Sequence, residues 1–247
     1  MPDTRRHRGP HPDDAKLFAP GMLPALRHAV ADYSMLLSKQ YAPTSALKLV
    51  GDHFSLTQRQ RMAVMRSACS DTQLANRLAK EIPTHGLKGN PILIDGYNLL
   101  ITTESALSGA FVFAGRDHCI RDVSGIHGSY RKVAETTTAI ELIASCLADL
   151  AVANARWLLD APISNSGRLK TLIRTLAEQN HWPWQVELLP NPDKELIAAD
   201  HVVATSDSNI LDRCSQWTNL TAHVIRLAIP DDPAATTLLD LAPDLDR

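Results

Sequence analysis

The sequence has few cysteines, no long apolar run and little net charge. Its four cysteines among 247 residues are widely separated and form no C-x-x-C pair. This spacing argues against a zinc site or a disulfide framework and favours a reduced, cytoplasmic protein. No apolar stretch reaches the roughly 18 residues of a transmembrane helix, so we expect no membrane partner. The net charge of −2 excludes a strong overall basic field, so any nucleic acid must be met by a local patch.

Several familiar motifs are also missing. The sequence contains no G-x-G-x-x-G, and the run at 167–171 lacks the Gly-Lys-Thr of a P-loop, so a dinucleotide or P-loop cofactor is unsupported. No Asp-x-Asp follows an expected strand, which disfavours an aspartyl-phosphate phosphatase. What is present must carry the function instead.

The chain divides into two regions with different periodicity. We predict a disordered tail over residues 1–14, a helical domain over 15–86, an α/β domain over 90–228 and a loose tail over 229–247. The first helix is expected over 23–39, and Thr57 with Gln60 forms the pattern of a helix-opening capping box.

Apolar runs of strand length alternate with helical patterns after residue 90. Such an order predicts an α/β fold: a mostly parallel sheet with helices on both faces, preceded by a small all-α domain. Helices are expected over 134–153, 164–179 and 208–217. The expected strands span 92–95, 156–160, 184–189, 201–206 and 223–227.

Three of these strands end on an aspartate: Asp95, Asp160 and Asp207. Parallel sheets place their ligands outside the carboxyl ends of the strands, so the three carboxylates could converge. Carboxylates that close repel one another unless a proton or a cation lies between them. The pattern therefore points to Mg²⁺ or Mn²⁺, ions that carboxylates and waters hold where phosphates are handled.

Each of these residues also has a purely structural interpretation. Asp95 and Asn98, in the Asp-Gly-Tyr-Asn that follows the first strand, could simply form a turn, although a rigid apolar strand favours function. A strand-end aspartate such as Asp160 is weak support alone. Asp207 could be only a helix cap.

Further candidates lie around these strand ends. Asp193 and Glu135 are possible additional metal ligands. A long insertion at 98–132 is expected to be functional, with a β-hairpin at 111–121 as its plainer interpretation. Arginines of the helical region, Arg66 among them, could contact phosphates from a basic helix, but we favour their interpretation as a solvated helix face. The candidate substrate-binding residues are Arg131 and Lys132 for a phosphate, Tyr130 for stacking on a base, and His127, Lys194 and Ser208.

The α/β region resembles the PIN-like nuclease superfamily, and its NYN branch in particular, in the Asp-Gly-Tyr-Asn at 95–98 and the Thr-Ser-Asp-Ser at 205–208. The whole chain is similar to a two-domain family in which a DUF434 helical domain precedes a DUF5616 PIN-like domain. The segments that carry this resemblance are 46–52, 57–61, 122–131 and 192–196.

The resemblance implies a metal-dependent ribonuclease in which Asp95, Asp160 and Asp207 match the superfamily acids. Asp193 and Glu135 match less securely, and the 98–132 insertion departs from the usual pattern. Relatives of this class are often dimers, so a homodimer is an open alternative. Two other functions stay open: a non-catalytic RNA- or protein-binding module, and a hydrolase of small nucleotides or phosphate esters.

Overall fold

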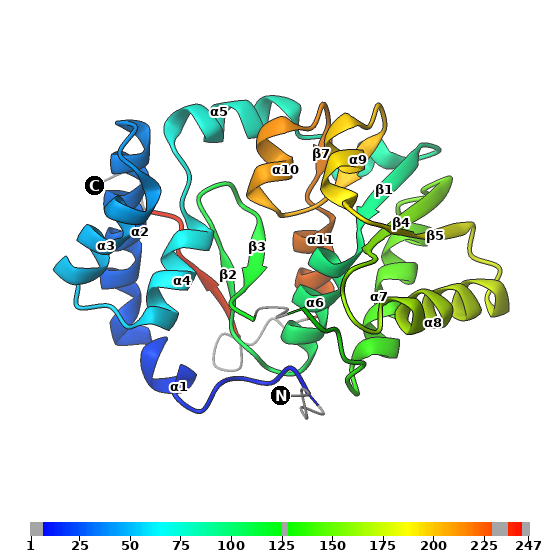
Figure 1. Ribbon diagram of the computed structural model, residues 1–247, viewed down its shortest axis with the longest axis horizontal. Coiled ribbons are helices and arrows are strands. Elements are labelled where there is room, and N and C mark those ends of the chain that lie inside the picture. Colours follow the sequence, from blue (N-terminus) through cyan, green and yellow to red (C-terminus); the bar gives the residue numbers. More distant parts are fainter. Residues whose placement is uncertain (1–6, 125–127, 229–236, 244–247) are drawn as a thin grey trace.

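The computed structural model describes residues 7–124, 128–228 and 237–243. Figure 1 shows a helical region at one end, a large sheet with its covering helices at the other, and a small sheet between them. Across the described ranges, no helix has both the length and the apolar character needed to cross a bilayer.

The helical region begins most of its helices with the local signals expected from the sequence. Proline occupies the first turn of α3, where its missing N–H costs nothing. Complete capping boxes open α4, through Thr57 and Gln60, and α5, through Ser70 and Gln73. The elements are α1 (Asp14–Leu17), η1 (Pro20–Met22), α2 (Leu23–Ser38), α3 (Pro43–His53), α4 (Gln58–Ser67), α5 (Asp71–Lys80) and η2 (Thr84–Leu87).

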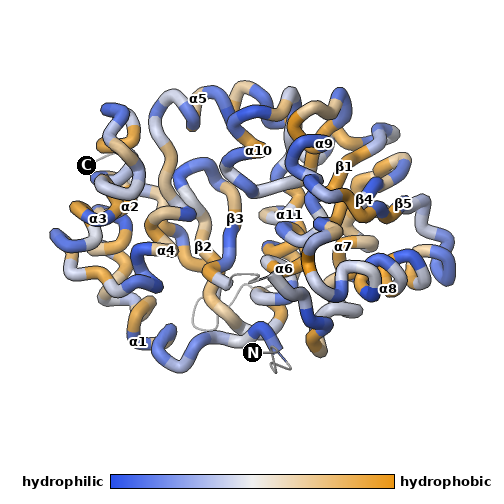
Figure 2. The backbone as a smooth tube through the Cα atoms, in the orientation of Figure 1, coloured by the Kyte–Doolittle hydropathy of each residue, from blue (hydrophilic) through white to orange (hydrophobic). Residues whose placement is uncertain are grey.

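A five-stranded sheet forms the centre of the α/β region. All of its neighbouring strands run parallel, in the order β5-β4-β1-β6-β7, so the predicted parallel sheet is confirmed. Figure 2 shows β1 and β4 as apolar segments, as expected for strands buried on both faces. The strands are β1 (Pro91–Asp95), β4 (Asn154–Asp160), β5 (Trp184–Leu189), β6 (Val202–Ala204) and β7 (Trp217–Thr218).

Helices cover both faces of this sheet. Ile92 and Ile94 point into a core shared with α6, α7, α8 and α11, whereas Leu93 points into the opposite core with α9 and α10. This alternation along one strand places a helical layer on either side. The helices are α6 (Gly96–Leu107), α7 (Thr136–Asp149), α8 (Ser166–Gln179), α9 (Pro192–Ala198), α10 (Ser208–Arg213) and α11 (Leu220–Ala228).

The strand predicted over 223–227 is wrong, because these residues lie in α11 and the last strand of the sheet is β7. Leu220, Val224 and Ile225 are buried, which is the spacing of one helix face rather than the alternation of a strand. The side chain of Asn219 accepts a hydrogen bond from the Ala222 amide and caps this helix. The helix expected to reach residue 217 accordingly ends at Arg213.

A second, three-stranded sheet joins the insertion to the end of the chain. β2 (Val112–Ala114) pairs antiparallel with β3 (Ile120–Asp122), which confirms the hairpin, and parallel with β8 (Leu238–Asp240). The tail predicted to be loose therefore contributes a strand, followed by the fully buried Leu241.

This small sheet shares one hydrophobic core with the helical region. Phe113 and Leu241 pack with residues of α2, α3 and α4, including Leu26 and Val64. The ring of Phe18 lies 4.8 Å from that of Phe113. The helical region thus packs on the α/β region through the insertion.

Four charged residues, here called the ion cluster, link three elements; three of them are buried and Asp212 is partly buried. Arg77 of α5 donates to Asp117 (2.6 Å) and to Asp212 of α10 (2.6 Å). Arg121 of β3 donates through both terminal nitrogens to Asp117, at 2.9 and 2.7 Å. Every charge in the cluster therefore meets an opposite charge.

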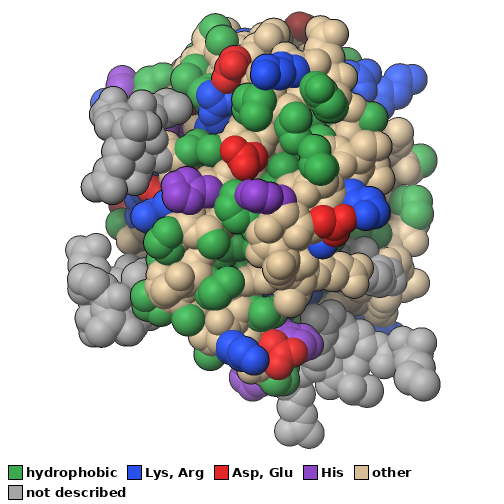
Figure 3. All heavy atoms as spheres, turned by 90° about the vertical axis from the view of Figure 1, so that its left-hand side faces the viewer, with side chains coloured by type: hydrophobic (Ala, Val, Ile, Leu, Met, Phe, Trp, Pro, Cys, Tyr) green, Lys and Arg blue, Asp and Glu red, His purple; other side chains and the backbone are tan. Residues whose placement is uncertain are grey.

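The outer face of the helical region mixes apolar, charged and histidine side chains (Figure 3). Met35 is 45% exposed and Leu49 is 59% exposed. Apolar residues scattered among polar ones are normal on a protein surface, so this face has the composition of a solvated one.

Candidate functional site

The site lies where the chain reverses its direction of travel across the sheet. The chain passes from β1 to β4 and β5 on one side, and then returns to β6 and β7 on the other. The carboxyl ends of the neighbouring strands β1 and β6 flank this switch point, which is where open α/β sheets bind ligands. Asp95 ends β1, and Asp207 follows β6 by three residues.

Side-chain hydrogen bonds fasten these two strand ends together. The hydroxyl of Thr205 donates to Asp95 Oδ2 (2.8 Å) and accepts from the Asp207 amide (3.0 Å). Asn98 Oδ1 accepts from both the amide (2.9 Å) and the hydroxyl (2.7 Å) of Ser206. Asn98 therefore braces the β6 end, and Asp95 is held in a fixed position.

Gly96 is required by a close approach rather than by a turn. A Cβ at this position would lie 2.6 Å from Leu159 Cδ2 and 2.9 Å from the Leu158 carbonyl oxygen. The missing side chain lets the start of α6 pack directly on β4, and so sets the height of Asp95 and Asn98 above the sheet.

A cavity of about 200 Å³ opens over these strand ends, and we call it the carboxylate cavity. Four of the predicted residues line it: the carboxylates Asp95, Asp193 and Asp207, and the amide Asn98. Its described lining is Arg66, Asp95, Tyr97, Asn98, Ile101, Asp122, Ser124, Asp193 and Asp207.

The carboxylates of this cavity perturb one another. Burial and, after it, the charges of Asp207 and Asp193 raise the pKa of Asp95 to about 7, despite hydrogen bonds from Thr205 and Asn98. Burial and the charge of Asp207 likewise raise the pKa of Asp193. Such mutual repulsion is typical of sites that bind a cation or move a proton.

The donor chemistry of the cavity suits a hard divalent ion, because its oxygen donors come from carboxylates. The arrangement is more open than a finished metal centre. Within the part of the chain that the structure describes, no three His, Cys, Asp or Glu side chains are placed to hold one ion. Asp207 Oδ1 already accepts the amides of Asn209 (2.8 Å) and Ile210 (3.2 Å), so this residue is a helix cap as well.

Asp160 and Glu135 do not line the carboxylate cavity. Asp160, at the end of β4, lies beside it: burial and the charge of Asp193 raise its pKa. Glu135 directly precedes α7, and its Oε1 lies 2.6 Å from Nδ1 of His7. The expectation that Glu135 faces the strand ends is wrong, because the first turn of α7 faces the N-terminal segment.

Tyr130 is not available for stacking on a base. Its side chain is buried, and its hydroxyl donates to Glu104 at 2.5 Å, while its ring packs 5.5 Å from that of Tyr97. The guanidinium of Arg8 covers the ring at 5.3 Å. Tyr130 therefore belongs to the hydrophobic core.

The other predicted substrate residues are distributed around the site. Arg131, with Lys132 and Arg168, lines a second cavity of about 780 Å³, here called the basic groove. Lys194 is exposed on α9, and Ser208 begins α10. His127 lies outside the described residues. The described lining of the groove is Ser129, Tyr130, Arg131, Lys132, Asn165, Arg168, Leu169, Thr171, Leu172 and Thr175.

Two charged residues of the carboxylate cavity were not among the site residues predicted from the sequence. Asp122 ends β3, and its two carboxylate oxygens accept from the Ser124 amide (2.6 Å) and from Thr102 Oγ1 (3.0 Å). Arg66, interpreted from the sequence as solvated, reaches the cavity from α4. The signal for Asp122 was its place at the start of the family segment 122–131. The signal for Arg66 was the basic helix to which it belongs, for which a solvated face was the favoured interpretation.

Comparison with known proteins identifies the family. Residues 84–223 match the family described as "Domain of unknown function (DUF5616)", and the chain belongs to it. Residues 25–80 match "Protein of unknown function (DUF434)", so the predicted order of the two families is confirmed. The boundary between them falls between α5 and η2.

One curated relative comes from Methanocaldococcus jannaschii and carries the name "Uncharacterized protein MJ0935". The two chains are 30% identical over 187 residues, which is 76% of this chain and 89% of the relative. No solved structure gives a significant match to the chain.

Proposed function

We propose that this protein is a metal-dependent phosphodiesterase of the PIN-like class that cleaves RNA in the cytoplasm. Asp95, Asp193 and Asp207 would hold Mg²⁺ or Mn²⁺ at the switch point of the sheet. When bound, the metal activates a water and stabilises charge on the phosphoryl group. All four cysteines are free and buried, which suits a reducing compartment.

The observation that carries this proposal is the electrostatic state of Asp95. Burial of its carboxyl and, after burial, the charges of Asp207 and Asp193 raise its pKa to about 7. A cation between these groups would remove the repulsion and restore their ionised forms. A fold has no structural need for such crowding, so the cavity has the character of a binding site.

The chain itself provides the rigid frame for this chemistry. Thr205 orients the Asp95 carboxylate, and Asn98 holds the β6 end through Ser206. Side chains placed on strand ends and fixed by hydrogen bonds give the precision that catalysis needs. Asp160 stands next to the cavity as a further acid.

The basic groove supports a polymeric anion as the substrate. Its lining includes the cations Arg131, Lys132 and Arg168, and no acidic residue is part of its described lining. Residues Ser129 and Ser164 form an isolated β-bridge that joins the groove wall to the segment after Asp160. A strand of RNA could therefore run from the groove toward the carboxylate cavity.

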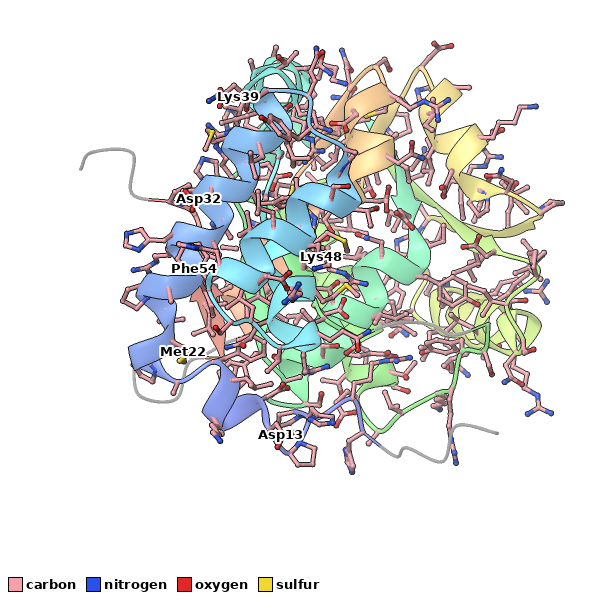
Figure 4. All side chains as sticks on the ribbon, turned by 60° about the vertical axis from the view of Figure 1, so that its left-hand side comes forward. Asp13, Met22, Asp32, Lys39, Lys48 and Phe54 are labelled. Atoms are coloured by element: carbon pink, nitrogen blue, oxygen red, sulfur yellow. The ribbon has the colours of Figure 1, made fainter. Side chains whose placement is uncertain are left out.

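Hydrolysis of single-stranded RNA tests the proposal. We expect cleavage with Mn²⁺, loss of cleavage with a chelator, and at least about 100-fold slower cleavage by Asp95→Asn, because a metal site contributes several kcal/mol. Asp32→Asn is the matched control; Asp32 lies on α2 in the helical region (Figure 4) and should not affect the rate. Equal rates for the wild type and Asp95→Asn would end the proposal.

The open geometry of the acids favours one alternative, a non-catalytic RNA-binding module. In the described residues no three potential ligands surround a common point, as a preformed metal centre would require. This alternative predicts RNA binding that survives both chelation and Asp95→Asn, with no cleavage under any condition. Free nucleotides in the same assay would detect a small-molecule hydrolase.

A further inference from the structure

We infer that Arg66 binds a phosphate of the substrate and that the helical region is thereby part of the active site. The inference rests on the proposed function for the chemistry, and on the packing of α4 for the geometry. It gives the helical region a role in substrate binding.

Arg66 is the one cation in the described lining of the carboxylate cavity, which also contains four aspartates. Its side chain is 31% exposed, so it is open to a ligand. Its Nη1 donates to the Asp122 carbonyl oxygen at 2.5 Å and lies 3.6 Å from Asp122 Oδ1. A guanidinium has five N–H donors, so this hydrogen bond uses only part of its capacity.

The end of α4 is fixed against the hairpin, so the position of Arg66 is well defined. The Arg116 amide donates to the Ser67 carbonyl oxygen at 2.8 Å. Gly115 permits this approach, because a Cβ there would lie 2.9 Å from Ser67 Cα. The hairpin therefore holds α4 by direct backbone contact.

Arg121 connects this arrangement to the catalytic strand ends. Its Nη1 donates to the carbonyl oxygen of Arg66 (3.0 Å), and its Nε donates to the carbonyl oxygen of Ser206 (2.7 Å). One buried side chain thus binds the backbone of α4 and the backbone that precedes Asp207. The helical region and the β6 end are consequently held in fixed relation.

A phosphate that enters this cavity meets carboxylates on several sides. A metal would offset part of their repulsion, and a cationic side chain at the rim would offset more. Arginine suits this position because its planar fork matches two phosphate oxygens. The plain alternative is that Arg66 only holds Asp122 in place.

Binding of a short labelled single-stranded RNA in chelator, where no cleavage occurs, separates these roles. We expect Arg66→Gln, which keeps an N–H donor and loses the charge, to weaken binding about tenfold, as for the loss of a charge-assisted hydrogen bond. The slope of log K against log salt should fall by about one, which is the signature of a lost phosphate contact. Arg66→Lys should retain most of the slope.

Lys48→Met is the matched control. Lys48 lies on α3 in the helical region (Figure 4), is 75% exposed and pairs with Asp52. Its loss should leave both the affinity and the salt slope unchanged. Thermal unfolding of every variant reports whether the fold is retained.

The possible results are distinct. An unchanged affinity and salt slope in Arg66→Gln would overturn the inference, as would a wild-type protein that does not bind RNA. If Arg66→Gln lowers affinity and slope but no protein cleaves RNA with Mn²⁺, then Arg66 stands as a phosphate ligand and the proposed hydrolysis fails. If cleavage depends on Asp95 while Arg66→Gln binds RNA normally, the proposed hydrolysis stands and the role of Arg66 as a phosphate ligand fails.

Discussion

Two regions of this molecule gather aspartates, and their electrostatics differ. In the ion cluster, burial alone raises the pKa of Asp117, but Arg121 and Arg77 outweigh it and bring the pKa to about 2. In the carboxylate cavity, burial and neighbouring acids raise the pKa of Asp95 to about 7. The same residue type is thus held ionised in one place and close to neutral in the other.

This difference in pKa indicates a structural role for the ion cluster and a functional role for the carboxylate cavity. The ion cluster pairs every charge and joins α5, the hairpin and α10, so its role is explained by the fold. The carboxylate cavity leaves acids facing acids at the ligand-binding edge of the sheet, which no fold requires. Proteins tolerate such unfavourable arrangements mainly at functional sites.

The largest effect on stability is expected from breaking the ion cluster. Asp117→Asn should lower the free energy of unfolding by about 3–5 kcal/mol, because two buried guanidinium groups lose their shared partner. Urea unfolding measures this change. Asp71→Asn is the control: Asp71 pairs with Arg116, but its own side chain is 72% exposed, so its substitution should have little effect. A small effect of Asp117→Asn would remove the contrast between the two regions.

In the carboxylate cavity, by contrast, removing an aspartate charge should raise the free energy of unfolding. The folded-state pKa of Asp95, about 7, lies above its unfolded value, so protonation stabilises the fold at low pH and this contribution is lost as the pH rises through 7. Asp95→Asn should therefore match the wild type near pH 4 and exceed it above pH 7, by on the order of 2 kcal/mol. Chemical unfolding across this range in the absence of metal measures the difference.

The sign of this pH effect distinguishes the two regions. Asp117, with its lowered pKa, should lose its contribution to stability as the pH falls from about 4 to about 2. If Asp95→Asn were less stable than the wild type at pH 8, the proposed repulsion in the cavity would be wrong.

The smallest stability change is expected for Asp207→Ser, which tests whether Asp207 is more than a helix cap. Serine caps helices well, so the free energy of unfolding should change by less than about 0.5 kcal/mol. At Mn²⁺ about tenfold above its Kd, the wild-type Tm should rise by roughly 3–6 °C. Asp207→Ser should lose that rise. A full Mn²⁺ response in the variant would leave Asp207 with the capping role alone.

Local sequence patterns predicted the elements that depend on nearby residues. The apolar run before Asp95 specified β1, and Thr57 with Gln60 specified the start of α4. Periodicity failed at α11, whose short apolar run suits either a strand or a helix. The position of Glu135 beside His7 depended on the N-terminal segment, 128 residues away in the sequence, and no local pattern carries that information.

The amino-acid sequence by itself determined that Asp95 and Asp160 end parallel strands, because the apolar runs before them favour buried strands and each run stops at its aspartate. Only the tertiary structure decided that Asp122 and Arg66 complete the same cavity. These two residues are 56 positions apart and meet through the packing of α4 on the hairpin. Such packing depends on the shapes of whole elements, whereas propensity and capping act within a few residues of the chain.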